Sequence, residues 1–265
     1  MPLVLALIQT FAATLLTILS IGSLLSYILL TPFVPRRITA FGSGKQIEAH
    51  LDLFLRQFPS IADVTIINRT INDRTASLQQ VISSMNHPSS VHFLASQAPG
   101  SEADIQSAVR QADVIICATS STQPLFPSSW VRTATHVVLI GSYKPEMKEV
   151  DRELILRALL GKMVVDSREA SLQEAGELID AKIHADQLME IGELVSIDKL
   201  GVAAKKTLIP GGRTENTETG FDGPVTLFKS VGLGIQDVAM ASAIVEKALA
   251  WEGEKIGTVV SDYDA

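Results

Sequence analysis

The amino-acid sequence predicts an α/β protein with a doubly wound, mainly parallel sheet, and two observations lead to that prediction. First, short apolar runs alternate with amphipathic stretches between residues 37 and 166, which is typical of strand–helix–strand units. Second, the first apolar run ends in the glycine turn Gly42-Ser43-Gly44-Lys45-Gln46, at the start of a helical pattern. Ligands of such folds bind at the carboxyl ends of the strands, so the segments after each strand are the candidate site.

The first unit has the layout of a Rossmann-type dinucleotide-binding motif. A strand at Arg37–Phe41 precedes the glycine turn, and an amphipathic helix at Lys45–Phe58 and a second strand at Val64–Asn68 follow it. Backbone N–H groups at the turn can cradle a pyrophosphate, where Lys45 either adds charge or is a solvated lysine. The motif is imperfect, because Ile47 replaces a third small residue, and a glycine pair after a strand can also be an ordinary turn.

The end of the second strand predicts which dinucleotide binds. An acidic residue there favours NAD, whereas a cation favours the 2′-phosphate of NADP. The chain has Asn68, Arg69 and Thr70 at this place, with Arg74 beyond them and no carboxylate before Asp73. We therefore expect the first three residues to surround the adenine ribose and its 2′-phosphate, and NADPH to be preferred over NADH. The alternative is that Arg69 is an ordinary surface cation.

The remaining elements continue the alternation. Thr119, Ser120 and Ser121 end the fourth strand, where their hydroxyl groups line the path of the cofactor or simply form a turn. Further strands are expected at Val91–Ala95, Ala112–Thr119, His136–Gly141 and Lys162–Asp166, and the last of them closes the parallel series. Further helices are expected at Glu102–Gln111, Asp151–Leu160, Glu174–Glu193 and Ile235–Trp251. Val225–Ser230 is strand-like, and Pro210–Gly223 is expected to be an exposed loop.

Composition excludes several classes of function. A net charge of −7 over 265 residues argues against a nucleic-acid surface, which needs clustered cations. The five histidines show no metal-ligand spacing, so no metal site is expected. The single cysteine, Cys117, rules out an internal disulfide, lies in an apolar run as a structural thiol would, and fits a reducing, cytoplasmic compartment.

The N-terminal segment permits two interpretations. No charged residue occurs from Pro2 to Pro35, and Leu3–Leu30 is long enough to span a bilayer. The Arg36-Arg37 pair that follows would then keep the rest of the chain in the cytosol. The same segment, with its recurring serines and threonines, also fits a buried helix and strand of a soluble domain.

Four blocks of residues, taken together, resemble the ornithine cyclodeaminase/mu-crystallin family. They occur in the family's order, and the resemblance covers roughly residues 38–250. Within the family, Asn68-Arg69-Thr70 resembles the NADPH-using mu-crystallin, or ketimine reductase, branch. The blocks are Gly42–Gln46; Ala112–Thr119 with Pro124; Val165–Arg168 with Glu174–Glu177; and Phe228–Gly232 with Asp237.

The resemblance implies a Rossmann domain and a second domain that binds substrate and makes a homodimer. That second domain is built mainly from the chain before the glycine turn. Because only about 40 residues precede the turn here, most of the substrate and dimerisation domain looks missing. The expected organisation is an apolar segment at 1–37, an NADP-binding domain at 38–230, and a C-terminal helix and tail at 231–265. For the apolar segment, the resemblance favours a degenerate family helix over a membrane anchor.

Two positions depart from the family's pattern. The helix before the Rossmann domain normally carries an Arg-Thr pair whose arginine grips the substrate carboxylate, and Ser20 and Ile21 stand there instead. Ornithine cyclodeaminases have a catalytic aspartate where this chain has Tyr143, and a phenol with a pKa of about 10 is a poor base at neutral pH. Both departures argue against a deaminating cyclisation, and the change at Tyr143 does not argue against imine reduction.

The resemblance also implies roles for four further residues. Ile140 and Gly141 would lie near the nicotinamide. Ser230 would hydrogen-bond the nicotinamide carboxamide, unless it is only a strand-end hydroxyl. Glu174 would lie near the substrate, unless it is a solvated helix glutamate.

The expected function is therefore an NADPH-dependent reduction of a small cyclic imine or ketimine. Hydride would reach the imine carbon, and Tyr143 or Lys144 could supply a proton. A truncated, catalytically silent NADPH-binding protein is the alternative, and a true ornithine cyclodeaminase is a weaker one. Expected partners are a small imine or amino-acid-like substrate and, if the missing region is present, a second copy of the chain.

Overall fold

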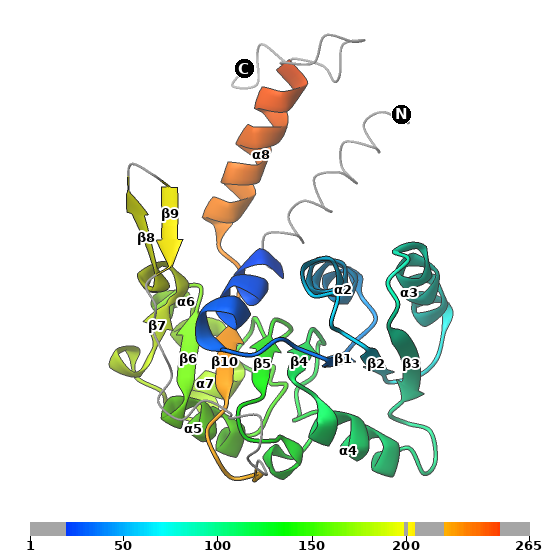
Figure 1. Ribbon diagram of the computed structural model, residues 1–265. Helices are drawn as coiled ribbons and strands as arrows, with labels where there is room; N and C mark the ends of the chain where they lie inside the picture. Colours follow the sequence, from blue (N-terminus) through cyan, green and yellow to red (C-terminus); the bar gives the residue numbers. More distant parts are fainter. Residues whose placement is uncertain (1–19, 199–200, 205–219, 250–265) are drawn as a thin grey trace, which may run out of the picture.

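One parallel sheet of eight strands organises the protein (Figure 1). The computed structural model describes residues 20–198, 201–204 and 220–249. The order across the sheet is β3 (Ser90–Ala95), β2 (Asp63–Asn68), β1 (Arg37–Phe41), β4 (Val114–Cys117), β5 (His136–Leu139), β10 (Thr226–Lys229), β6 (Lys162–Val165) and β7 (Met189–Glu190).

Helices cover both faces of this sheet, which confirms the predicted Rossmann-type α/β fold. Figure 1 shows α2 and α3 on one face and α4 and α5 on the other. The helices are α2 (Lys45–Gln57), α3 (Asp73–Ser84), α4 (Glu102–Gln111), α5 (Arg152–Leu160), α6 (Arg168–Glu174), α7 (Gly176–Asp180) and α8 (Gly234–Leu249), with short 3-10 turns at Ser128–Trp130, Ala185–Gln187 and Ile191–Leu194 and a separate antiparallel pair of β8 (Val195–Asp198) and β9 (Gly201–Ala204).

Side chains along each strand alternate between two apolar cores. In β4, Ile115 and Cys117 pack on the face that α4 and α5 cover, whereas Val114 and Ile116 pack on the face that α2 and α3 cover. All four side chains are fully buried, as a continuous apolar run in a parallel sheet requires. Burial raises the pKa of the Cys117 thiol, so this group is protonated and structural.

The order of the strands reverses between β1 and β4. From β1 the chain builds β2 and β3 on one side, and then crosses back to place β4 and β5 on the other side. Phe41 at the end of β1 lies in register with Cys117 at the end of β4. In doubly wound sheets the crevice outside this reversal holds the ligand. The residues that follow these two strands, Gly42 and Ala118, therefore stand at the expected entrance of the site.

The N-terminal apolar segment is described from residue 20 onward. Residues 20–30 form a helix that lies on the same face of the sheet as α2, and Gly22 packs so closely against the ring of Phe228 that a Cβ there would lie 3.0 Å from it. In the described part of the chain, no helix is both long and apolar enough to cross a bilayer. The part of the predicted span before residue 20 lies outside the described residues. Three serines on the inner side of the helix are fully buried: Ser20, Ser23 and Ser26.

Two predictions about the second half of the chain are wrong. Lys162–Asp166 does not close the parallel series, because β10 inserts between β5 and β6, and β7 lies beyond β6. Residues 174–193 do not form one helix but contain α7, two 3-10 turns and β7. The helical path ends at Lys182, whose φ of 57° lies in the left-handed region that a helix cannot continue through.

Two helices, α6 and α3, have no counterpart among the predicted elements, and α3 is the longer of the two. Its apolar period is weak, since Thr75, Leu78 and Ile82 are the buried positions in it. A reciprocal capping box starts it: the Asn72 side chain accepts from the N–H of Thr75, and the Thr75 side chain accepts from the N–H of Asn72. Most of the loop predicted at 210–223, and the end of the helix predicted to reach Trp251, lie outside the described residues.

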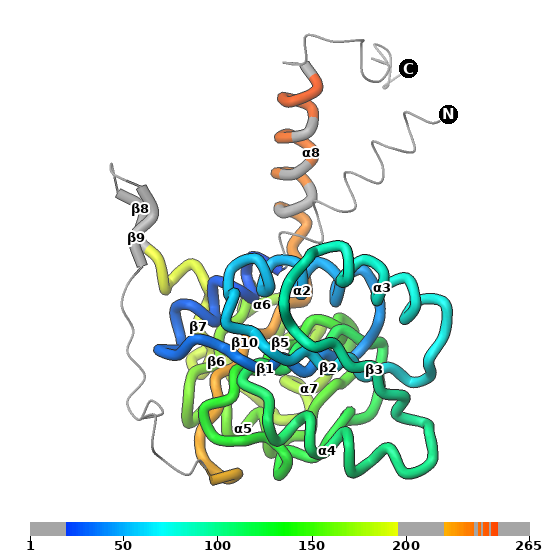
Figure 2. Tube along the Cα trace, turned by 45° about the vertical axis from the view of Figure 1, so that its right-hand side comes forward, coloured from blue at the N-terminus to red at the C-terminus, as the bar shows by residue number. Residues whose placement is uncertain are grey.

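Helix α8 extends away from the sheet in both Figure 1 and Figure 2. Ile235, Val238 and Val245 on this helix are 72%, 64% and 55% exposed. Exposed apolar side chains of this kind are unfavourable in water.

Candidate functional site

The glycine turn after β1 has the geometry of a phosphate cradle. Gly42 has a φ of +115°, and a Cβ on it would lie 2.8 Å from the carbonyl oxygen of Ala118. A side chain is thus excluded twice, by the backbone conformation and by the neighbouring strand end. Gly44 is the N-cap of α2 and makes no side-chain cap hydrogen bond, which leaves the first N–H groups of the helix for a ligand.

A cavity of about 900 Å³ follows the carboxyl ends of β1, β2 and β4. It begins at the glycine turn, passes the segment after β2 and reaches the hydroxyl-rich segment after β4. Its lining includes Gly42, Ser43, Gly44, Asn68, Arg69, Thr70, Asn72, Asp73, Arg74, Ser96, Gln97, Thr119, Ser120, Ser121, Pro124 and Leu125.

Two exposed arginines line the β2 side of this cavity. Neither Arg69 nor Arg74 forms an ion pair with another residue that the structure describes. The Asn68 side chain donates to the carbonyl oxygen of Thr70 at 2.8 Å, which holds the segment in a tight turn. Asp73 lies on the same wall, so the positive potential of the two arginines is partly offset there.

A second cavity, of about 280 Å³, lies at the carboxyl ends of β4, β5 and β10. It shares Ala118, Thr119 and Ser120 with the larger cavity, so the two form one groove along the edge of the sheet. Tyr143, with 49% of its surface exposed, stands at this end. The lining is completed by Gln46, Ile140, Gly141, Ser230, Val231 and Gly232.

Most of the residues predicted for the site line this groove. The cofactor residues predicted after the first, second, fourth and fifth strands, together with Ser230 and Tyr143, belong to its walls. Lys45, Lys144 and Glu174 do not. Lys45 forms a 2.6 Å ion pair with Glu48 on the surface of α2, Lys144 is exposed with its ammonium 5.8 Å from the centre of the Tyr143 ring, and Glu174 ends α6.

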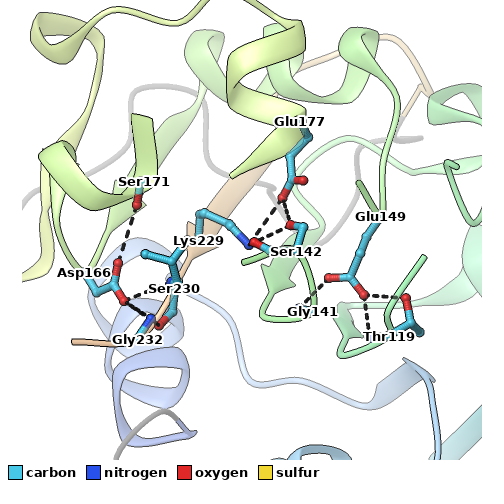
Figure 3. Close-up of polar contacts among 11 residues, drawn as sticks. Thr119, Gly141, Ser142, Glu149, Asp166, Ser171, Glu177, Lys229, Ser230 and Gly232 are labelled. Carbon is cyan, nitrogen blue, oxygen red and sulfur yellow. Dashed lines mark hydrogen bonds and ion pairs between the residues drawn. The ribbon is translucent and has the colours of Figure 1, made fainter. Parts of the chain in front are cut away.

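Beneath the second cavity, the carboxylate of Glu149 joins two strand ends (Figure 3). Its Oε1 accepts from the N–H and the hydroxyl of Thr119, at 2.7 and 2.8 Å, and its Oε2 accepts from the N–H of Gly141 at 2.8 Å. Glu149 is fully buried. Burial raises its pKa to about 7, against the opposing effects of Lys229 and of the Thr119 hydrogen bonds.

A buried ammonium, that of Lys229, interacts electrostatically with this carboxylate. Lys229 in β10 is fully buried and donates to the carbonyl and hydroxyl oxygens of Ser142, at 2.6 and 2.7 Å. The Ser142 hydroxyl donates to Glu177 at 2.5 Å, and the Lys229 ammonium lies 3.4 Å from the same carboxylate oxygen. Two carboxylates, those of Glu149 and Glu177, and the ammonium of Lys229 are therefore buried together in this part of the protein. Figure 3 shows their hydrogen bonds.

The turn after β10 is held by a third carboxylate, that of Asp166. One of its oxygens accepts from the Ser230 hydroxyl at 2.6 Å and from the N–H groups of Val231 and Gly232 at 3.0 and 2.9 Å. The Ser230 hydroxyl proton is thus directed at Asp166, so Ser230 can offer a ligand only an acceptor while this bond persists.

Sequence reasoning gave no role at the groove to Glu149 and Lys229. The only signal in the sequence is a charge inside an apolar context: Lys229 follows Leu227 and Phe228, and Glu149 precedes Val150. Such residues are usually solvated at an element's end, and only the tertiary structure shows that they are buried and paired.

Comparison with known protein families and curated proteins agrees with this geometry. The model of the ornithine cyclodeaminase/mu-crystallin family matches residues 29–252. The ketimine reductase mu-crystallin of Rattus norvegicus is 31% identical over 205 residues, which cover 77% of this chain and 53% of the relative. A Δ(1)-pyrroline-2-carboxylate reductase of Bacillus cereus is 30% identical over 223 residues, 81% of this chain and 58% of the relative. The chain thus spans little more than half the length of these relatives.

Solved structures share the fold. The Δ(1)-pyrroline-2-carboxylate reductase of Thermococcus litoralis, solved with NADH and L-proline, superposes with a TM-score of 0.69 at 22% identity, over 95% of this chain and 68% of that one. An archaeal alanine dehydrogenase dimer with bound NAD gives a TM-score of 0.65 at 24% identity, over 91% and 65% of the two chains.

Proposed function

Because this chain belongs to the ornithine cyclodeaminase/mu-crystallin family, we propose that it binds NADPH and forms the cofactor-binding part of a reductase of a small cyclic imine or ketimine. The observation that carries this proposal is the continuous groove from Arg69 to Tyr143, which passes the glycine turn at the point where the strand order reverses. A dinucleotide is an elongated ligand whose phosphates lie between its two nucleosides. In this groove the glycine turn likewise lies between the end that Arg69 lines and the end that Tyr143 lines.

The residues of the groove fit the parts of the cofactor. The N–H groups at Gly42–Gly44 and the start of α2 would bind the pyrophosphate. Arg69 would pair with the 2′-phosphate of the adenine ribose, because a guanidinium binds phosphate through parallel N–H bonds. At the other end, Ile140 and Gly141 would lie beside the nicotinamide, and Ser230 would accept from its carboxamide.

The chemistry at the nicotinamide end is simple. Bound NADPH would supply a hydride that converts a C=N bond to an amine. The imine nitrogen gains one proton in the same conversion, and the exposed Tyr143 phenol is a side chain in the cavity that can donate it. Lys144 lies outside the cavity lining, with its ammonium 5.8 Å from the centre of the Tyr143 ring.

The printed names of the relatives indicate the substrate class. A ketimine and Δ(1)-pyrroline-2-carboxylate are both small C=N compounds, and the second is a cyclic imino acid. We extend this class to the present chain, without choosing a member. A cytoplasmic location and a homodimer complete the proposal, and both rest on sequence features and family likeness.

Binding and turnover test the proposal separately. NADPH and NADH are titrated by quenching of tryptophan fluorescence, and consumption of NADPH is then followed with Δ(1)-pyrroline-2-carboxylate. Binding of NADPH with imine-dependent oxidation is the expected result. If neither dinucleotide binds, the proposed function is wrong.

A second candidate function is a catalytically silent NADPH-binding protein. The chain spans about half of its relatives' length, and Ser20 occupies the position that the resemblance assigns to a substrate-binding arginine. Ser20 is fully buried, so its hydroxyl is not presented to a substrate. Tight NADPH binding without oxidation by any cyclic imine would favour this candidate. An in-frame coding sequence upstream of Met1 would favour the reductase.

A further inference from the structure

Two strand ends bound the nicotinamide half of the groove, and a single side chain ties them together. Thr119 follows β4 and Gly141 follows β5, and both line the second cavity. A carboxylate suits the place between them, because three donors converge on it: two N–H groups and one hydroxyl. The approach is tight, since a Cβ on Gly141 would lie 2.5 Å from Glu149 Oε1.

We propose that Glu149 is a positioning residue that sets the nicotinamide half of the cofactor site by tying the Thr119 strand end to the Gly141 strand end. This inference rests on the proposed function, because it assumes that the groove binds a nicotinamide dinucleotide. Glu149 lines neither cavity, so it acts through the two residues that do.

The adenine half of the groove provides an internal reference. Its far end is formed by the glycine turn and by the residues after β2, and none of the three Glu149 hydrogen bonds reaches those segments. Thr119 lies where the two cavities meet. Loss of the tie should therefore weaken ligands that occupy the nicotinamide end and spare ligands that occupy only the adenine end.

The substitution Glu149→Gln removes the charge and one hydrogen-bond acceptor of the side chain but keeps its size. A glutamine side chain has the same shape, but one of its two ends is an NH₂ donor. Because the three groups that bond the Glu149 carboxylate are all donors, one end of the glutamine would face an N–H group, and the strand end on that side would be released or repelled. A merely space-filling role would be preserved in this variant.

The charged groups around Glu149 determine how its hydrogen bonds to Thr119 and Gly141 change with pH. The ionisable groups that interact with it are Lys229 in β10, Glu177 in α7 and the Cys117 thiol in β4. The ammonium favours the ionised form, whereas Glu177 and burial oppose it. With a pKa raised to about 7, Glu149 gains a proton as the pH falls through neutrality, and one of its acceptor positions is lost.

The experiment compares two ligands by isothermal titration calorimetry. NADP⁺ fills both halves of the groove, whereas adenosine 2′,5′-bisphosphate fills only the adenine half. Both ligands are compared at about pH 8, where their phosphate monoesters are almost fully dianionic. In the Glu149→Gln variant we expect the NADP⁺ affinity to fall about tenfold while the bisphosphate affinity stays unchanged. Glu146→Gln, an equal charge change at an exposed position of the same loop, is the matched control and should alter neither.

A measurement on the unmodified protein keeps the inference testable if the variant fails to fold. Between about pH 8 and about pH 6, the NADP⁺ affinity should decline in the wild type relative to that of 2′-phospho-ADP-ribose, which lacks only the nicotinamide and carries the same titrating 2′-phosphate. It should be flat in Glu149→Gln. A flat wild-type ratio overturns the inference.

The remaining outcomes are equally decisive. If both ligands weaken together in Glu149→Gln, the residue only supports the fold and the inference is wrong. If neither weakens, the tie has no effect on the site. If the wild type binds neither ligand, the proposed function fails. If it binds both but the variant behaves as the wild type, the function stands and only the role of Glu149 is lost.

Discussion

Ser23 on the N-terminal helix and His50 on α2 are joined by a 2.8 Å hydrogen bond between two fully buried side chains. The other ring nitrogen of His50 bonds the carbonyl oxygen of Gln46 at 2.7 Å. One turn further along the helix, Ser26 contacts His136 at 3.1 Å, and His136 in turn bonds Thr226 at 2.8 Å. Two imidazoles thus fasten residues 20–30, one to α2 and the other to β5 of the sheet.

This arrangement predicts that acid weakens the fold. Burial lowers the pKa of His50 to about 4 and that of His136 to about 3, from 6.5 in the unfolded chain. Since the unfolded state binds more protons, stability is full above pH 6.5 and declines as the pH falls from there toward 4 and 3. Each unit of pKa difference corresponds to about 1.4 kcal/mol.

Urea unfolding at a series of pH values measures this effect. The free energy of unfolding should drop between about pH 6.5 and about pH 5, because the unfolded chain takes up two histidine protons there. Glu149, whose pKa is raised to about 7, takes up its proton first in the folded state and offsets part of this drop. His136→Gln, which cannot gain a charge, should reduce the slope, whereas His92→Gln at an exposed position of β3 should not. An unchanged slope in His136→Gln would contradict the assignment.

Elements of the fold could be predicted from the sequence where the local residue pattern fits only one environment in the folded protein. The apolar run of β4 and the amphipathic period of α2 each specify one environment, and both elements lie where predicted, although β4 is shorter. The position of β10 was not accessible, because its residues also fit an edge strand or a strand of another sheet. Nothing local in Thr226–Lys229 indicates that it must lie between β5 and β6.

The candidate site could also be predicted from the sequence only in part. Parallel strands end on one edge, so the segments after β1, β2, β4 and β5 could be assigned to a common groove from their order alone. The side chains behind the groove could not be. Glu149 and Lys229 look like solvated charges in the sequence. Their hydrogen-bond partners are distant along the chain: Thr119 is 30 residues from Glu149, and Ser142 is 87 residues from Lys229.

We expect the chain to prefer NADPH to NADH. A 2′-phosphate bonded to Arg69 would contribute about 1.5–3 kcal/mol, which is roughly ten- to a hundredfold in affinity. Arg69→Ala should remove the difference, measured by fluorescence titration of both cofactors. Arg56→Ala, which removes an exposed cation paired with Asp52 on α2, is the control and should preserve it. Equal affinities in the wild type would refute the assignment.

No release of ammonia from L-ornithine is expected. Tyr143 stands where the resemblance places the catalytic carboxylate of cyclodeaminases, and a phenol is a poor base at neutral pH. Tyr143→Asp alone should not create the activity, because Ser20 gives no guanidinium to grip the substrate carboxylate. The measurement is proline formation with NAD and ornithine. Steady proline production by the wild type would contradict this prediction.

Self-association or poor solubility is expected rather than stable membrane insertion. Apolar side chains protrude from two helices: Ile21 and Ile28 are 49% and 47% exposed on the N-terminal helix, and Ile235 and Val238 are more exposed on α8. At about 25 cal/mol per Å², a few hundred Å² of such surface costs several kcal/mol in water. Replacing both α8 residues by glutamate should shift the chain toward monomer.

Size-exclusion chromatography and carbonate extraction distinguish the outcomes. Deletion of residues 1–19 leaves the helix over 20–30 in place, whereas deletion of residues 1–35 removes it and should unfold the sheet, since its serines are buried. A wild-type chain that elutes as a soluble monomer would contradict the predicted self-association or poor solubility. Retention in the membrane pellet after carbonate would instead support the anchor interpretation of the N-terminal segment.

Two glycines of the groove should respond oppositely to alanine. A Cβ on Gly141 would lie 1.9 Å from the Thr119 carbonyl oxygen, so Gly141→Ala should cost more than about 3 kcal/mol of stability. A Cβ on Gly44 meets no atom within 4 Å, and its φ of −84° suits alanine. Gly44→Ala should keep nearly full stability and weaken NADPH, because the new methyl group would occupy the phosphate cradle. Thermal unfolding and cofactor titration of both variants check this.

The central place of β10 has a consequence for how the chain is made. Ribosomal synthesis delivers β5 and β6 more than 60 residues before the strand that must separate them. Until residue 229 emerges, the two strands must stay apart or pair with each other in a wrong sheet. The same late strand carries the ammonium of the buried cluster, so Glu149 and Glu177 stay without this countercharge until then. Their mutual repulsion would oppose premature closure of the gap until the last strand arrives.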